Sequence, residues 1–486
     1  MIANVKIYFD ICFFILYNFS CSGEKMEYKT VHEISEKWKM KERKITDFCR
    51  EKRIAGARKE GKNWLIPSDA IKPIDRRTRD YATREIESTY AENNGSEKVF
   101  KAFKEKYQKE PMYMGFTPYR ICPLGAHSDH NLGKITGFAI DKGIHIAYSI
   151  KHNGVIELTS LQFPKRAQWF VLETPSVKEN DWADYLRGAT IALNKRYSLK
   201  YGMSAVICGE LPIGGLSSSA AITITFINAL AFLNNIKINP EELIDIAQEA
   251  ENLYVGVSSG RLDQSCEIYS KKDKLLYMDF KDHSYKLIAK PDNMKPFAIG
   301  IFFSGLEHNL SSSKFNMRVD ELRSAAYCLE ALSGMDYGKF NETNMRDVPY
   351  ETYLKYKDVL PKNFAKRAEH FFTEFKRVEE GAKAYAKGDI ETFGRLVSES
   401  GYSSIYNWET GSPELKKLYE ILKDCEGVYG TRFSGAGFKG CCIAIMNPDY
   451  INSINEKVTK EYCEAFPELK DRFSIHICYS ADGVKL

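Results

Sequence analysis

The stretch from Gly209 to Leu233 constrains the fold of this chain more than any other. Its sequence, GELPIGGLSSSAAITITFINALAFL, places two glycines and three serines directly before a long apolar run. Glycine permits backbone angles that other residues avoid, so Gly214 and Gly215 predict a tight turn. The apolar run that follows predicts a buried helix. We therefore expect a turn opening a helix whose first N–H groups have no partner within the helix.

A helix start of this kind can bind an anion. Its unpaired N–H groups and its positive dipole end face the ligand, and the small serine side chains let a phosphate approach. The GK[ST] ending of a Walker motif is absent, so the stretch is not a conventional P-loop. Since a Gly/Ser turn can also be a plain helix cap, this stretch alone leaves both interpretations open.

A second glycine-rich stretch, GTRFSGAGFKGCCIAIM, lies near the end of the chain. Gly435, Gly437 and Gly440 satisfy the GxGxxG spacing of dinucleotide-binding folds. That fingerprint requires a helix after the glycines. The apolar run from Cys441 to Met446 predicts a strand instead. We therefore expect a second glycine loop and not a Rossmann motif.

Polar side chains gather in a third stretch, RICPLGAHSDHNLGK, which begins at Arg120. A predicted strand reaches a tight turn at Gly125, and His127, Asp129 and His130 follow within five residues. These three could form a metal site, a catalytic pair or a clamp for a polar ligand. A metal site has little support, because no further His or Cys group stands at ligand spacing.

Taken together, the three stretches resemble the GHMP kinases and, within them, the galactokinase family. The family motifs occur in this order, and the resemblance covers about residues 107 to 486. It implies an ATP-dependent sugar 1-kinase of α+β class, with an N-terminal domain like domain 2 of ribosomal protein S5 and a ferredoxin-like C-terminal domain. The matching segments are Arg120 to Asp129, Gly215 to Ala220, Ser434 to Cys441 (loosely), WADYLRG from Trp182 to Gly188, and GRLDQS from Gly260 to Ser265.

The resemblance also implies roles for individual residues. Asp263 would be the base near the anomeric hydroxyl and Arg120 its cationic neighbour. The residues themselves suggest the Ser219 hydroxyl and the Glu251 carboxylate as magnesium ligands, because Glu251 stands at the border of the apolar face of a helix capped by Asn239 and Pro240. A surface ion pair is the alternative for Glu251. A guanidinium beside the base would stabilise charge that grows on the reacting oxygens. His127 and Asp129 would hold sugar hydroxyls, which makes the third stretch a sugar clamp that Gly260 and Phe315 complete. ATP would contact Trp182, Gly214, Gly215, Leu216, Ser217, Ser218, Ser219, Ala220, Gly435 and Gly437.

Departures from the family pattern bear on the substrate. Galactokinases carry a Glu that accepts a hydrogen bond from the sugar C6 hydroxyl, where this chain has Ala126. A carboxylate at C6 would be repelled by that Glu, so alanine predicts D-galacturonate as substrate, with galactose or another hexose as the alternative. Phe315 and His130 replace family tyrosines, and the role of His130 stays open. Arg261 and Arg318 are candidate partners for the substrate carboxylate.

A basic segment precedes the kinase-like part. Residues 26 to 77 hold 15 Lys and Arg against 9 Asp and Glu, an excess of 15 − 9 = +6 in a chain of net charge +4. Thr30 and Glu33 predict a capping box, and a second helix and a hairpin around KEGK follow. The segment resembles the winged helix-turn-helix of excisionase and MerR-like proteins. DNA contact through Lys41, Arg43, Lys44 and Arg50 and a solvated basic face are the alternatives.

The length of 486 residues predicts more than one domain. We expect an N-terminal extension over 1–25, a winged helix-turn-helix over 26–75, a linker over 76–106, and kinase domains over 107–292 and 293–486. Residues 1–25 suggest a mis-assigned start codon or a short anchor. Scattered cysteines and no membrane span favour the cytoplasm. A regulator whose kinase-like body only senses sugar is the alternative to an enzyme.

Overall fold

The computed structural model describes residues 28–50, 54, 57–68, 70, 94–163, 166–306, 312–336 and 338–485. The chain divides into two compact units, Met1–Glu92 and Asn93–Leu486. The expected extension over 1–25 lies outside the described residues, as does most of the expected linker. The linker range nevertheless includes most of a helix, α5 (Asn94–Tyr107), that belongs to the second unit.

The described part of the first unit contains two helices and three short strands. Thr30 and Glu33 form the predicted capping box at the start of the first helix. The apolar side chains Ile34, Ile45 and Phe48 are buried together, which joins the two helices. The strands pair in the order β1-β3-β2. The elements are β1 (Tyr28–Thr30), α2 (Val31–Trp38), α3 (Glu42–Arg50), β2 (Arg58–Glu60) and β3 (Asn63–Pro67).

An eight-stranded sheet forms the first half of the second unit. Its order is β10-β9-β5-β8-β6-β7, with β4 and β15 also paired to β5, and β6 and β8 are its parallel neighbours. The chain end thus returns to this half as β15. The strands are β4 (Tyr113–Ile121), β5 (Lys134–Lys151), β6 (Val155–Ser160), β7 (Ala167–Phe170), β8 (Gly202–Gly209), β9 (Lys274–Asp279), β10 (Ser284–Ala289) and β15 (Ser480–Ala481).

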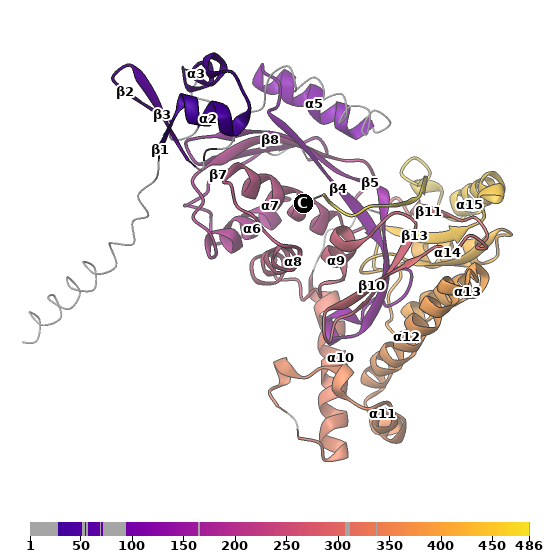
Figure 1. Ribbon diagram of the computed structural model, residues 1–486. Coiled ribbons are helices and arrows are strands. Elements are labelled where there is room, and N and C mark those ends of the chain that lie inside the picture. The colour runs from indigo at the N-terminus through magenta and orange to yellow at the C-terminus, as the bar shows by residue number, and fades with distance from the viewer. Residues whose placement is uncertain are drawn as a thin grey trace, which may run out of the picture. The chain divides into compact units, whose positions relative to one another are not determined.

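Helices cover both faces of this sheet. Successive side chains of a strand point to opposite faces, so apolar neighbours in one strand contact helices on different sides. Ala147 packs with Val99 and Phe103 of α5 on one face. Its neighbour Ile146 joins the large core beneath the other helices on the opposite face (Figure 1). These are α6 (Asp184–Asn194), α7 (Ser218–Leu233), α8 (Pro240–Glu249) and α9 (Leu262–Tyr269). The apolar run of the predicted helix is therefore α7, buried as expected.

A four-stranded antiparallel sheet in the order β12-β13-β11-β14 forms the second half (Figure 1). The run Cys441–Met446 is strand β13, as its composition predicts. The strands are β11 (Ala298–Phe303), β12 (Val428–Phe433), β13 and β14 (Ser474–Cys478). The helices are α10 (Ser312–Ser333), α11 (Tyr350–Tyr356), α12 (Lys362–Lys387), α13 (Ile390–Tyr406), α14 (Pro413–Lys423) and α15 (Ile451–Ala465).

Three further expectations can be compared with the described residues. No helix among them is both long enough and apolar enough to cross a lipid bilayer. The ten cysteines within the described ranges are all free thiols. Nor do the described side chains bring together three or more His, Cys, Asp or Glu residues in a metal-binding group. The metal interpretation of His127, Asp129 and His130 therefore gains no support.

Candidate active site

A buried ion pair lies where β4 ends and α9 begins. Arg120 donates from Nε and from its terminal nitrogen to Asp263 Oδ1, at 2.8 and 2.6 Å. The hydroxyl of Ser217 donates to the other carboxylate oxygen at 2.6 Å. Burial alone would lower the pKa of Arg120, but the Asp263 carboxylate raises it overall. The Arg120 side chain is 4% exposed and that of Asp263 28%, so the carboxylate is the member that a ligand can reach.

The ion pair lines a pocket. The two glycine-rich stretches and the stretch that begins at Arg120 all contribute to its wall. Arg120 also donates to the carbonyl of Gly215 at 3.0 Å, which ties the ion pair to the first glycine loop. The pocket therefore joins segments that are far apart in the chain. The predicted residues on its wall are Arg120, Ala126, His127, Asp129, Gly214, Gly215, Ser217, Ser218, Ser219, Glu251, Gly260, Asp263, Phe315 and Gly435.

The two glycine loops pack directly against each other beside the start of α7. A Cβ atom on Gly440 would lie 2.7 Å from the backbone carbon of Gly214, and one on Gly435 would lie 2.9 Å from Gly215 Cα. Gly215 and Gly435 also have φ angles of +90° and +67°, which favour glycine. Only residues without a side chain allow this approach, which leaves the N–H groups at the start of α7 near the second loop.

The clamp residues His127 and Asp129 line the same pocket as these loops. The His127 ring stacks on Trp408, with centroids 5.0 Å apart and planes 8° apart, and burial holds its pKa well below the usual value. Asp129 accepts from the N–H of Leu262 at 3.1 Å, and burial raises its pKa to about 6. A Cβ on Gly260 would lie 2.1 Å from Asp129 Oδ2, so glycine is required there.

Glu251 is a buried carboxyl group on the pocket wall, in the π-helical turn Ala250–Val255 that follows α8. It accepts from Ser259 Oγ at 2.7 Å and from Gln264 Nε2 at 3.3 Å. Burial, and next to it the charge of Asp263, raise its pKa to about 7. A cation in the pocket would favour the ionised form. Glu251 and Ser219 thus fit a magnesium ion that takes its other ligands from phosphates and water.

Four predicted nucleotide contacts do not lie on the described wall of this pocket. Leu216 and Ala220 are 2% exposed, and their side chains are buried in the fold. Trp182 stacks on Phe163, with ring centroids 6.0 Å apart. Gly437 adopts a φ of +75°, and a Cβ there would meet Thr410 at 3.0 Å. Their contact with ATP stays a prediction.

Several residues of the site belong to none of the sequence motifs. Trp408, whose ring stacks on His127, follows the end of α13 and lies outside every motif. Arg432 lies on the pocket wall one residue before the end of β12; it falls inside the second glycine-rich stretch, but none of the family motifs includes it. The two candidate partners of a substrate carboxylate have acidic partners of their own: Arg261 pairs with Glu241 at 2.6 Å, and Arg318 with Glu321 at 3.1 Å. His130 lies edge-on to Phe315, at 6.0 Å between centroids.

Comparisons with known proteins agree with this architecture. The model for the GHMP kinases N terminal domain matches residues 184–271, which include the Gly/Ser loop and Asp263. The model for the GHMP kinases C terminal domain matches residues 382–465, which include the second glycine loop. The two-domain fold and the pocket lined by both of these loops therefore define a GHMP kinase.

Similar proteins of known activity indicate which family of GHMP kinases the chain belongs to. Galacturonokinase from Arabidopsis thaliana is 37% identical over 393 residues, 76% of this chain and 92% of that protein. Galactokinase from Roseiflexus sp. (strain RS-1) is 28% identical over 383 residues, 79% of this chain and 95% of that protein. The crystal structure of Lactococcus lactis galactokinase with galactose superposes with a TM-score of 0.72 at 26% identity, covering 79% of this chain and 98% of that one. The chain belongs to the galactokinase family.

Proposed function

We propose that the protein transfers the terminal phosphoryl group of ATP to the anomeric hydroxyl of D-galacturonate and releases the sugar 1-phosphate. The observation that carries this proposal is the Arg120–Asp263 pair, 2.6 Å apart, which faces a pocket lined by both glycine loops and by the clamp. Phosphoryl transfer needs the hydroxyl in line with the phosphate and the phosphate charge neutralised. This pocket offers a group for each need.

Each part of the pocket has a task in this reaction. His127 and Asp129 orient the sugar, and Asp263 accepts the proton of the attacking hydroxyl. Ser217 holds the second oxygen of that carboxylate in place. Arg120 stabilises charge on the attacking and transferred oxygens. Glu251 and Ser219 would hold a magnesium ion, which supplies positive charge to the phosphates when bound.

The same pocket favours catalysis over sugar sensing. A protein that only senses a ligand has no need for a base at the reacting hydroxyl, yet Asp263, Arg120 and Glu251 all line this pocket. The curated relatives are named as kinases, and no relative among those compared above is named as a regulator. We therefore propose the enzyme and not the sensor.

Galacturonate is the proposed sugar for three reasons. Ala126 is 7% exposed and lines the pocket, so no carboxylate occupies the place of the family Glu. Arg432 lies on the wall of the same pocket and brings a second guanidinium to it. In addition, the Arabidopsis thaliana relative is named galacturonokinase. A sugar acid meets less electrostatic repulsion here than beside a glutamate.

Steady-state kinetics on galacturonate, glucuronate and galactose test this proposal. We expect the kcat/KM for galacturonate to exceed that for galactose by about tenfold or more, since tenfold corresponds to about 1.4 kcal/mol of differential binding. ATP consumption is followed in a coupled assay with magnesium present. A clear preference for galactose would refute the acid-sugar assignment, and no turnover with any of the three sugars would refute the kinase.

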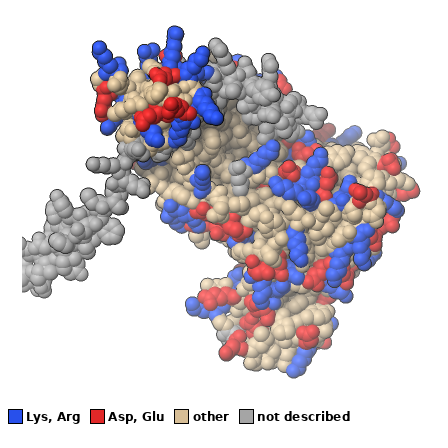
Figure 2. Space-filling view, in the orientation of Figure 1, with Lys and Arg blue, Asp and Glu red and all other residues tan. Residues whose placement is uncertain are grey.

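We also propose that the first unit is a winged helix-turn-helix that contacts DNA through α3. Lys41, Arg43 and Arg50 are exposed, while Ile45 and Phe48 of the same segment are buried. Figure 2 shows basic side chains standing out from this unit with acidic ones between them. Since counterion release makes phosphate contacts salt-dependent, we expect random duplex DNA to be bound by the full chain at 50 mM salt and released at 200 mM. Absence of a gel shift at low salt would refute the DNA contact.

A further inference from the structure

The turn that carries the sugar clamp has a backbone conformation that needs support. Gly125 has a φ of +98° and His127, which is not glycine, a φ of +61°. A residue other than glycine rarely adopts this left-handed conformation, and it persists only where the surroundings hold it. The direction of the His127 side chain depends on these angles. Whatever fixes this turn therefore fixes the sugar wall of the pocket.

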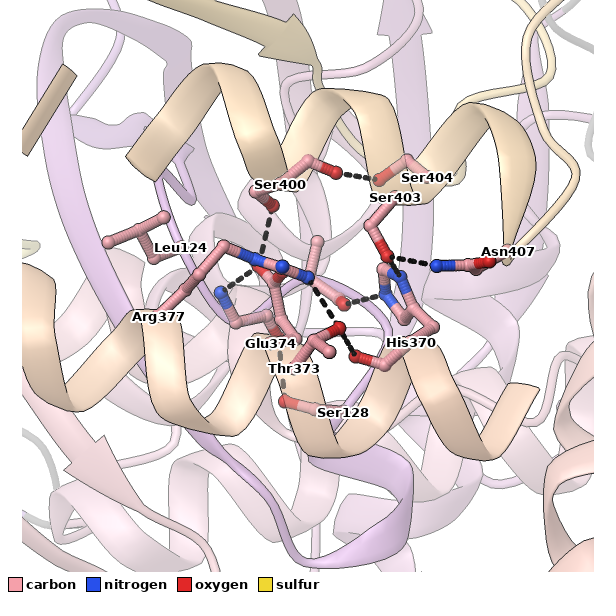
Figure 3. A network of polar contacts seen from close by, with 12 residues as sticks. Leu124, Ser128, His370, Thr373, Glu374, Arg377, Ser400, Ser403, Ser404 and Asn407 are labelled. Atoms are coloured by element: carbon pink, nitrogen blue, oxygen red, sulfur yellow. Dashed lines mark hydrogen bonds and ion pairs between the residues drawn. The ribbon is translucent and has the colours of Figure 1, made fainter. Parts of the chain in front are cut away.

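Helix α12 supplies one anchor, the carboxylate of Glu374. Its Oε1 accepts from the backbone N–H of Gly125 at 2.7 Å and from Ser400 Oγ of α13 at 2.6 Å. Its Oε2 accepts from Arg377, from Nε and from a terminal nitrogen, both at 2.8 Å. Each oxygen thus accepts two hydrogen bonds, which uses the lone pairs of both (Figure 3). Only a carboxylate can accept from every side.

Charge keeps Glu374 in this acceptor form. Its side chain is 0% exposed, and burial alone would raise its pKa. The guanidinium of Arg377, followed by the imidazole of His370 and the guanidinium of Arg432 at 3.6 Å, lower the pKa to about 2 instead. Arg432 also lines the pocket and leads into the second glycine loop. Neighbouring cations therefore keep Glu374 ionised, so that both of its oxygens can accept.

His370, one turn earlier on α12, supplies the second anchor. Its Nε2 lies 3.0 Å from the carbonyl oxygen of Ala126 and its Nδ1 lies 2.9 Å from Ser403 Oγ. A carbonyl can only accept, so Nε2 must carry the proton. Burial lowers the pKa of His370 to about 4, so the ring is neutral and Nδ1 accepts from the Ser403 hydroxyl. Ser403 in turn accepts from Asn407 Nδ2 at 3.1 Å, which completes the chain (Figure 3).

We infer that Glu374 and His370 are positioning residues for the sugar: they hold the N–H of Gly125 and the C=O of Ala126, and thereby aim His127 at the substrate. Neither side chain lies on the described pocket wall, so both act through the turn. This inference rests on the proposed function, because it assumes that the clamp binds the sugar. It predicts a defect specific to the sugar and not to ATP.

Two substitutions remove the anchors. In Glu374→Gln the amide nitrogen faces a donor whichever way it is placed, because both carboxylate oxygens are surrounded by donors. His370→Leu removes the donor to Ala126. We expect each to raise the KM for galacturonate by roughly tenfold or more, since a misplaced clamp costs orders of magnitude in rate or binding. The KM for ATP should stay within about twofold of wild type, because neither substitution touches the first glycine loop at the start of α7.

A conservative variant and a matched control separate positioning from simple damage. His370→Gln keeps an N–H of similar reach, so it should recover most of the loss seen in His370→Leu. Glu157→Gln is the matched control. Glu157, on β6, is another mostly buried carboxylate and pairs with Lys151 at 2.9 Å, so its replacement should leave both KM values unchanged. Thermal unfolding of every variant reports whether it folds. Should Glu374→Gln fail to fold, the His370 pair still decides the matter.

The outcomes are distinct. Equal rises in both KM values, or a lower melting temperature with unchanged KM for the sugar, would overturn the positioning role. If His370→Gln shows the same rise in the KM for galacturonate as His370→Leu, the hydrogen bond to Ala126 has no positioning role. If the wild type itself shows no turnover with any sugar, the proposed function fails, and that result is seen before any variant is compared.

Discussion

Replacing Asp263 with asparagine is expected to lower kcat by about 10²- to 10⁴-fold, the usual contribution of a general base. The amide is almost the same size as the carboxylate and can still lie beside Arg120 and Ser217, but it cannot take the proton of the attacking hydroxyl. It also removes the negative charge that Arg120 neutralises at 2.6 Å. Turnover in the coupled ATP assay measures the loss.

Binding separates this chemical defect from misfolding. The sugar and the nucleotide should still bind to Asp263→Asn by calorimetry, because the clamp and the glycine loops are unchanged. Asp279→Asn is a matched control: Asp279 also pairs with an arginine, Arg346 at 2.9 Å, but it is not on the pocket wall. Full activity of Asp263→Asn would show that the proton leaves by another route and would remove the central assignment.

Replacing Ala126 with glutamate is expected to reverse the sugar preference. The new carboxylate would meet the carboxylate of galacturonate in a largely buried wall, where like charges cost several kcal/mol. A cost of about 3 kcal/mol lowers the kcat/KM for galacturonate by roughly 10²-fold. Galactose has a hydroxyl at C6, which can donate to the glutamate, so its kcat/KM should be kept or rise. The ratio of the two values measures the reversal.

The variant Ala126→Gln tests whether charge or size is responsible. Glutamine fills the same space without the negative charge, so it should lower galacturonate turnover far less than glutamate. Equal losses in the two variants would mean that the wall excludes any longer side chain. In that case the absence of a carboxylate at position 126 would not explain the choice of sugar.

The sequence alone determined the local elements of this protein. Thr30 and Glu33 predict a capping box because that spacing satisfies two N–H groups at a helix start, and the box is present. Asn239 and Pro240 begin α8 for a related reason, since Asn accepts from an early N–H and Pro needs no partner there. The Gly/Ser turn before α7 and the strand Cys441–Met446 likewise follow from short-range patterns. Family motifs then gave most of the pocket wall.

Only the tertiary structure decided how distant residues meet. Arg120 and Asp263 are 143 residues apart in the chain, and Gly125 and Glu374 are 249 apart. Their contacts depend on how two sheets and the α12–α13 pair pack, which no short window of sequence encodes. Trp408, His370 and Glu374 read locally as ordinary helix or loop residues, whereas Leu216 and Ala220 sit in a binding motif but are buried in the fold. The spacing of apolar residues determines which face of a helix is buried. Which residues that face contacts depends on packing against segments from elsewhere in the chain.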